Sequence, residues 1–128
     1  MQRSMSRSLP VILCVDDDAA ALTVRALVLS SAGYEVISAS NANEALAILT
    51  THPIDLVITD HLLGRGTGAE LAAHIKRHKP HVLIALLSGL SEPPEGAEYA
   101  DVYLLKGTGV PEFLAAVRKL LAQRRLAA

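Results

Sequence analysis

Short apolar runs rich in β-branched residues alternate along this chain with longer segments of helical periodicity. Runs of this length and composition predict buried strands, and their alternation with helices predicts βαβ units and a parallel sheet. The five runs are VILCV (11–15), YEVISA (34–39), IDLVIT (54–59), VLIALL (82–87) and VYLL (102–105).

Four segments between or after these runs have the periodicity of helices. They are AAALTVRALVLSSAG (19–33), NANEALAILTTH (41–52), GAELAAHIKRHKP (68–80) and PEFLAAVRKLLAQRR (111–125). Asp18 and Asn41 are predicted N-caps, because short polar side chains accept hydrogen bonds from the first turn of a helix. The segment GLSEPPEGAEYAD (89–101) holds two prolines and two glycines, so the fourth helix is predicted to be stunted. We predict one α/β domain, a doubly wound five-stranded parallel sheet with strand order 2-1-3-4-5.

Length and charge narrow the class of protein. A chain of 128 residues fits one domain, which we expect to span residues 10–128 after a flexible tail at residues 1–9. With 12 basic and 13 acidic side chains the net charge is -1, which predicts no nucleic-acid partner. The apolar stretches are too short to cross a bilayer and no signal-peptide pattern opens the chain, so we expect no membrane partner and a cytoplasmic location. The lone cysteine, Cys14, is predicted to be a buried hydrophobe.

Polar side chains follow four of the five predicted strands. Asp16 and Asp17 follow the first, Asp60 the third, Ser88 the fourth and Lys106 the fifth. The carboxyl ends of parallel strands share one edge of the sheet, where ligands bind in open α/β folds. Crowded carboxylates repel one another, and oxygen ligands favour Mg²⁺. The pattern indicates a phosphoryl site in which Asp60 is the nucleophile, Lys106 neutralises the phosphoryl group and Ser88 donates a hydrogen bond to it.

Three glycines after Asp60 raise the alternative of a phosphate cradle at a helix N-terminus. Gly64, Gly66 and Gly68 form G-x-G-x-G after the third strand. A dinucleotide fingerprint requires G-x-G-x-x-G in the first βα turn, so both position and spacing argue against it. The aspartate, and not the glycine loop, is the predicted functional group.

The polar residues occur in a fixed order: VDD ends the first strand and begins its loop, and Asp60, Ser88 and Lys106 follow the third, fourth and fifth strands. This ordered set resembles the receiver domain of two-component response regulators. The resemblance covers nearly the whole chain after the tail and implies a flavodoxin-like fold. It implies that Asp60 is the phosphoacceptor and that Asp16 and Asp17 bind Mg²⁺ with it. It also implies a further metal ligand, the backbone carbonyl of Leu62.

The same resemblance assigns roles to the other polar groups. It implies that Lys106 contacts the phosphoryl group, that Ser88 is the hydroxyl switch residue and that Tyr103 is the aromatic switch residue. The implied partner is a sensor histidine kinase or a histidine phosphotransfer protein, and the domain is not predicted to be an enzyme. The stunted fourth helix is also similar to receivers attached to hybrid sensor kinases.

The chain departs from the family pattern at two loops. Gly64 and Gly107 stand where the family usually has proline. A degenerate receiver that binds partners without phosphorylation is therefore the alternative function. An aspartate-nucleophile phosphohydrolase is a less favoured one, since Leu62 takes the place of its general acid. His61, directly after Asp60, is predicted to be an exposed loop residue, with control of water access to the phosphoryl group as the alternative.

A helix on the surface of a domain needs one apolar stripe to pack on the core, but the predicted first helix has more than one. Val24 and Val28 are predicted to face the core, and Leu22, Ala26 and Leu29 to form an outer stripe. Because this helix begins beside the acidic pair, the outer stripe is the predicted docking face for the histidine partner. A weak homodimer contact is the rival explanation, so the protein is expected to be a monomer or a weak homodimer.

Overall fold

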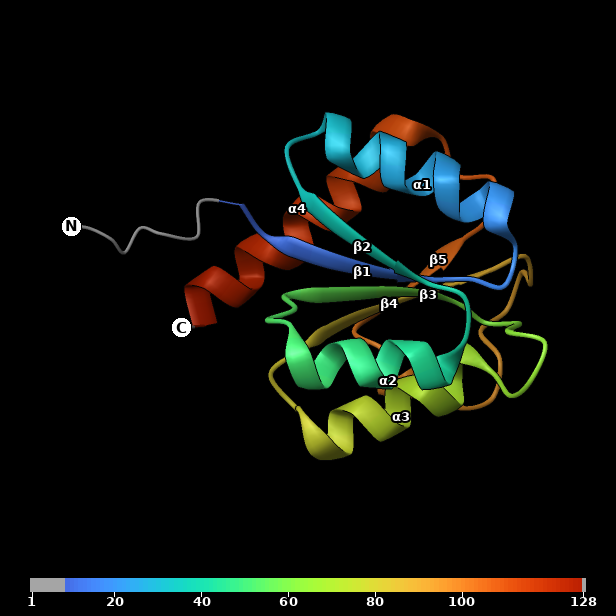
Figure 1. The fold of residues 1–128 in the computed structure, drawn as a ribbon. Helices are drawn as coiled ribbons and strands as arrows, with labels where there is room; N and C mark the ends of the chain where they lie inside the picture. Colours follow the sequence, from blue (N-terminus) through green and yellow to red (C-terminus); the bar gives the residue numbers. More distant parts are fainter. Residues whose placement is uncertain (1–8, 128) are drawn as a thin grey trace.

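A computed structural model describes residues 9–127, so the predicted tail lies outside the described residues except for Leu9. Five parallel strands form one sheet in the order β2-β1-β3-β4-β5, as predicted (Figure 1). The strands are β1 (Val11–Val15), β2 (Glu35–Ala39), β3 (Leu56–Asp60), β4 (Leu83–Ser88) and β5 (Val102–Leu105). The predicted strand ends differ from these by at most two residues.

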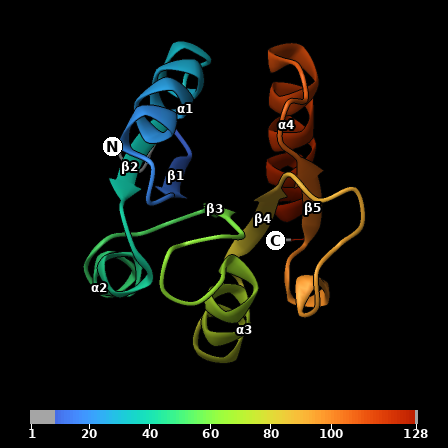
Figure 2. The ribbon, with the colours of Figure 1, turned by 90° about the vertical axis from the view of Figure 1, so that its right-hand side faces the viewer.

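Helices cover both faces of the sheet (Figure 2). They are α1 (Ala19–Ser31), α2 (Ala42–Thr51), α3 (Gly68–His78) and α4 (Val110–Ala127). α1 and α4 lie on one face, and α2 and α3 on the other. Between β4 and β5 the chain forms only the short 3-10 helix η2 (Ala97–Tyr99), which confirms the stunted fourth helix. Within residues 9–127, no helix is long and apolar enough to cross a membrane.

The core lies on the two faces of the central strands. Leu13 and Val57 pack on the face covered by α2 and α3, and Ile12 and Ile58 on the face covered by α1 and α4. This alternation follows from the two-residue period of a strand, and burial on both faces explains why these strands are apolar throughout. Cys14 is fully buried, and burial raises the pKa of its thiol to about 12. The prediction of a buried hydrophobic cysteine is confirmed.

Side-chain caps fix where the helices begin. The Asp18 carboxylate accepts hydrogen bonds from the backbone of Ala20 and Ala21 at 3.0 and 3.2 Å, and Asn41 caps α2 as predicted. Thr67 and Glu70 form a capping box at the start of α3. These caps hold the first turns of the helices at the carboxyl edge of the sheet.

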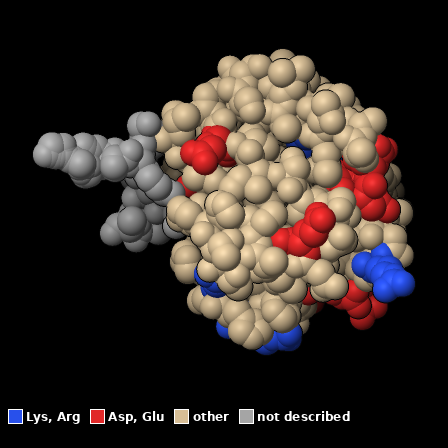
Figure 3. Space-filling view, viewed as in Figure 1, with Lys and Arg blue, Asp and Glu red and all other residues tan. Residues whose placement is uncertain are grey.

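Figure 3 shows acidic side chains gathered near the right-hand side, toward which the strands run in Figure 1.

The predicted rotation of α1 is wrong. Leu22 and Leu29 face the core and are 9% and 0% exposed, whereas Val24 is 62% and Leu27 is 67% exposed. Val28 is half-buried. Both stripes of this helix are apolar, so hydrophobicity does not decide which one packs on the sheet. The outer apolar surface of α1 is therefore formed by Val24 and Leu27.

Candidate functional site

Three carboxylates meet where β1 and β3 end. Asp16, Asp17 and Asp60 each offer an oxygen that lies within 4.8 Å of the other two. Asp16 and Asp60 are 0% and 4% exposed, and Asp17 is open to solvent. Grouped carboxylate oxygens of this kind fit a divalent cation that prefers oxygen ligands, because the cation removes their mutual repulsion. The three carboxylates predicted to bind Mg²⁺ are thus brought together.

Leu62 lies in the loop after β3, and its side chain is 69% exposed. It forms an isolated antiparallel bridge with Thr67, which closes the loop back toward the start of α3. The metal-ligand role of its backbone carbonyl stays a prediction.

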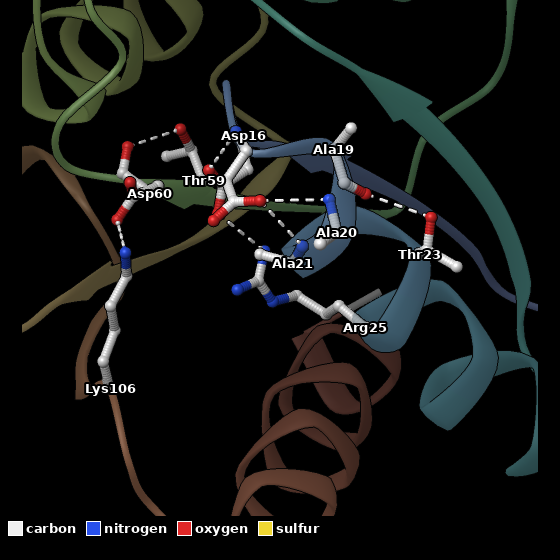
Figure 4. A network of polar contacts seen from close by, with 10 residues as sticks. Asp16, Ala19, Ala20, Ala21, Thr23, Arg25, Thr59, Asp60 and Lys106 are labelled. Carbon is white, nitrogen blue, oxygen red and sulfur yellow. Dashed lines mark hydrogen bonds and ion pairs between the residues drawn. The ribbon is translucent and has the colours of Figure 1, made fainter.

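Lys106 forms an ion pair with Asp60, with 2.8 Å between its Nζ and the Asp60 Oδ1 (Figure 4). The backbone N–H of Lys106 donates to the carbonyl of Ser88 at 2.8 Å, which anchors the lysine just beyond β5. Gly64 and Gly107 have φ angles of +77° and +89°, a region that the proline ring does not allow. The two loops therefore take a path closed to proline, and Lys106 nevertheless reaches Asp60.

A second cation lies against the other buried carboxylate. Arg25 on α1 donates from Nη1 to the Asp16 Oδ2 at 3.2 Å, and the Asp16 Oδ1 accepts the backbone N–H of Asp18 at 2.9 Å. The side chains of Arg25 and Asp16 are 14% and 1% exposed. Arg25 was not among the residues predicted at this site. The signal was a single charged residue in the middle of the apolar run ALTVRALVL.

The two predicted switch residues contact the loop that follows β4. Ser88 is buried, and its Oγ accepts the backbone N–H of Leu90 at 3.1 Å. The Tyr103 hydroxyl donates to the carbonyl of Leu90 at 2.6 Å. Both hydroxyl groups thus meet at Leu90, so the loop after β4 is tied to the strand that carries Ser88 and to β5.

His61 is buried, contrary to the prediction of an exposed loop residue. It is 8% exposed, and its Nδ1 has no hydrogen-bond partner among the described residues. Its backbone N–H donates to Leu87 at 2.8 Å and its carbonyl accepts from Gly68 at 2.7 Å, so the chain stays inside the fold for one residue beyond β3. The side chain lines a cavity of about 430 Å³ that Glu70 and Tyr99 also border.

A groove of about 500 Å³ lies between α1 and α4 and reaches the site. Val24, Arg25 and Val28 line it from α1, and Phe113 lines it from α4. Lys106 forms part of the same lining, so the groove opens beside the lysine that contacts Asp60. A second hollow of about 300 Å³ includes Leu27 and continues the apolar surface along the two helices.

Relatives of known sequence match most of the chain. The protein is 31% identical over 116 residues to the phosphate regulon transcriptional regulatory protein PhoB of Pseudomonas aeruginosa, covering 86% of this chain and 51% of that protein. It is 32% identical over 121 residues to the alkaline phosphatase synthesis transcriptional regulatory protein PhoP of Bacillus subtilis, covering 91% and 50%. The chain thus spans about half the length of these relatives.

Solved structures and a family model agree with this match. A CheY-like receiver domain protein from Methanospirillum hungatei JF-1 has a TM-score of 0.88 at 28% identity, over 94% of this chain and 100% of that one. The response regulator TrrA from Thermotoga maritima, in complex with Mg(2+)-BeF, has a TM-score of 0.83 at 32% identity, over 88% and 99%. The family model of the response regulator receiver domain matches residues 12–118. The chain therefore belongs to the response regulator receiver domains, the signalling modules that interact with histidine kinases or phosphotransfer proteins in two-component systems.

Proposed function

We propose that this receiver accepts a phosphoryl group on Asp60 from a phosphohistidine of a partner protein, and that phosphorylation changes its affinity for partners. The observation that carries the proposal is the Lys106–Asp60 ion pair of 2.8 Å beside two further carboxylates. In the transfer, an Asp60 oxygen bonds to phosphorus while the bond from phosphorus to the histidine nitrogen breaks. The electron pair of that bond returns to the imidazole.

The neighbouring side chains suit the charge that arrives. Lys106 is a point charge that balances a phosphoryl oxygen without leaving its place beside Asp60. Ser88 uses its oxygen as an acceptor toward Leu90, so its hydroxyl hydrogen is available for a phosphoryl oxygen. We propose that Tyr103 senses this change through its hydrogen bond to Leu90, because both hydroxyl groups contact that residue.

We propose that Asp16, Asp17 and Asp60 hold Mg²⁺, with the Leu62 carbonyl as a further ligand. The oxygen-only set and the mutual spacing of the carboxylates within 4.8 Å support this choice. When bound, the metal supplies positive charge that compensates the carboxylates and the phosphoryl oxygens. The structural relative TrrA was solved in complex with Mg(2+)-BeF, which is consistent with the same use here.

The test of the function is phosphorylation of the domain, which we take as residues 10–128, by a small donor. We expect incubation with acetyl phosphate and Mg²⁺ to add the mass of one phosphoryl group, measured by intact-protein mass spectrometry. Chelation of Mg²⁺ with EDTA should suppress the gain. If the wild type gains no mass at saturating donor and Mg²⁺, the alternative of a phosphorylation-independent binding module is favoured.

Addition of Mg²⁺ alone is expected to raise the melting temperature of the wild type, because the metal relieves the repulsion within the acidic cluster. At a Mg²⁺ concentration ten times its Kd, the gain in the free energy of unfolding is about 1.4 kcal/mol. Asp17→Asn should remove most of this gain, measured by thermal melts with KCl at matched ionic strength as the control. An equal rise in wild type and variant would place the metal elsewhere.

The exposed apolar surface of α1 is the proposed docking face for the histidine partner. Val24 and Leu27 are mostly exposed, and Val24 lines the groove that reaches Lys106. A large exposed apolar patch on a folded protein usually marks an interaction site. A partner helix packed on this face would lie next to the edge of the sheet that carries Asp60.

Val24→Glu is expected to slow phosphoryl transfer from a histidine partner by about tenfold, because a charge on the docking face costs about 1.4 kcal/mol of binding. Phosphorylation by acetyl phosphate should be unchanged, since Val24 is not one of the residues that form the acidic cluster and a small donor needs no docking face. Ala47→Glu, on the exposed side of α2, serves as the matched control. Equal transfer rates in wild type and Val24→Glu would place the docking face elsewhere.

A further inference from the structure

Arg25 lies on the stripe of α1 that faces the core, among apolar side chains. It lies three residues after Leu22 and four before Leu29, so all three share the stripe that faces the core. An arginine side chain can bury its aliphatic stem along apolar neighbours and extend its charged end. Here the guanidinium reaches the Asp16 Oδ2 at 3.2 Å, at the edge of the sheet.

The charges of the site are nearly balanced by the protein itself. Three carboxylates, Asp16, Asp17 and Asp60, lie with two cations, so the formal charge is -3 + 2 = -1. Lys106 neutralises Asp60, and Arg25 neutralises Asp16. The Arg25 pair is the more deeply buried one, because its cation is 14% exposed and that of Lys106 is 43% exposed. Solvent therefore screens the Arg25–Asp16 pair less.

We propose that Arg25 is a built-in counter-ion that competes with Mg²⁺ for Asp16, stabilising the metal-free site and lowering its affinity for the metal. This inference rests on the proposed metal role of the acidic cluster. Both Asp16 oxygens are already engaged, one by the N–H of Asp18 and the other by Arg25. A divalent cation that uses Asp16 must therefore share Oδ1 with the Asp18 N–H, share Oδ2 with the guanidinium, or displace the guanidinium. On either oxygen of this carboxylate the cation lies close to the positive charge of Arg25, and the two like charges repel.

The test compares Arg25→Met with the wild type in two measurements. Methionine keeps an unbranched apolar stem and removes the charge. We expect the Kd for Mg²⁺, measured by isothermal titration calorimetry, to fall by about tenfold, because the competing charge is gone. In EDTA, we expect the melting temperature of the variant to fall, because Asp16 is left as a buried unpaired charge.

Arg25→Met is thus expected to bind Mg²⁺ more tightly while its metal-free form becomes less stable, and this combination separates a counter-ion from a residue that only stabilises the fold. A purely structural arginine would lower the melting temperature with and without Mg²⁺ and leave the Kd unchanged or weaker. Arg25→Lys keeps the charge and should keep the Kd within about twofold of the wild type. Arg77→Met removes the same charge from the exposed end of α3 and should leave the Kd unchanged.

A third measurement uses the wild type and does not depend on whether Arg25→Met folds. Saturating Mg²⁺ is expected to shift the side-chain nitrogen resonances of Arg25 in an NMR titration, because the guanidinium shares or loses its acceptor. Unshifted resonances under saturating Mg²⁺, or an unchanged Kd in a folded Arg25→Met, would overturn the inference while the metal role stands. If neither wild type nor variant binds Mg²⁺, the metal role and this inference both fail.

Discussion

Asp60→Asn is expected to abolish the mass gain that acetyl phosphate and Mg²⁺ produce in the wild type. Among the three clustered carboxylates, Asp60 alone ends a central strand and contacts Lys106, at 2.8 Å. An amide oxygen is not a nucleophile toward phosphorus under these conditions, so the loss should be complete and not merely a slower rate. Intact-protein mass spectrometry after long incubation distinguishes these two outcomes.

The variant should remain folded, which makes the result interpretable. Replacing Asp60 removes one of three mutually repulsive charges, and the Lys106 side chain it leaves behind is 43% exposed and can be solvated. Asp18→Asn is the matched control, because asparagine caps α1 as well as aspartate and Asp18 lies next to the acidic pair. Full phosphorylation of Asp60→Asn would mean that another carboxylate is the acceptor, which peptide mapping would identify.

The strands and the grouping of the site residues could be predicted from the sequence because both depend on local patterns. Buried parallel strands are apolar on both faces, so their runs stand out from the amphipathic helices. Once the strand order is fixed, residues that follow strands must meet at one edge, which is why Asp16, Asp60 and Lys106 lie together. Asp18 and Asn41 were equally predictable, since a cap acts within one turn of its own position.

Three features could not be predicted from local patterns in the sequence: the rotation of α1, the contact of Arg25 with Asp16 and the burial of His61. Two apolar stripes give a helix no preferred face by hydrophobicity, so only packing decides that Leu22 lies inside and Val24 outside. Arg25 meets Asp16 only after that rotation is set, because the two residues come from different elements. His61 is buried by the approach of α3, which no feature of its own neighbours in the sequence indicates.

Gly68→Ala is expected to destabilise the fold by roughly 3 kcal/mol, the upper part of the range for overpacking. Gly68 is the first residue of α3, and an added Cβ would collide with the backbone carbonyl oxygen of Asp60 and lie 2.7 Å from the Leu86 Cδ1. The higher helix propensity of alanine would stabilise α3 by about 1 kcal/mol relative to glycine, which is too little to offset the cost of the collision. The Asp60 carbonyl cannot yield easily, since it accepts the Thr59 hydroxyl at 3.0 Å within a buried strand.

Urea denaturation measures this loss, and thermal melts should show a melting temperature lower by about 10 °C. Gly89→Ala is the matched control, because a Cβ at Gly89 meets nothing within 4 Å, so its free energy of unfolding should change by less than about 1 kcal/mol. The collision at Gly68 involves the residue proposed to accept the phosphoryl group, so Gly68→Ala should also slow phosphorylation under conditions where it is still folded. Wild-type stability in Gly68→Ala would show that α3 can move away from β3, and that the close approach of helix and strand does not position Asp60.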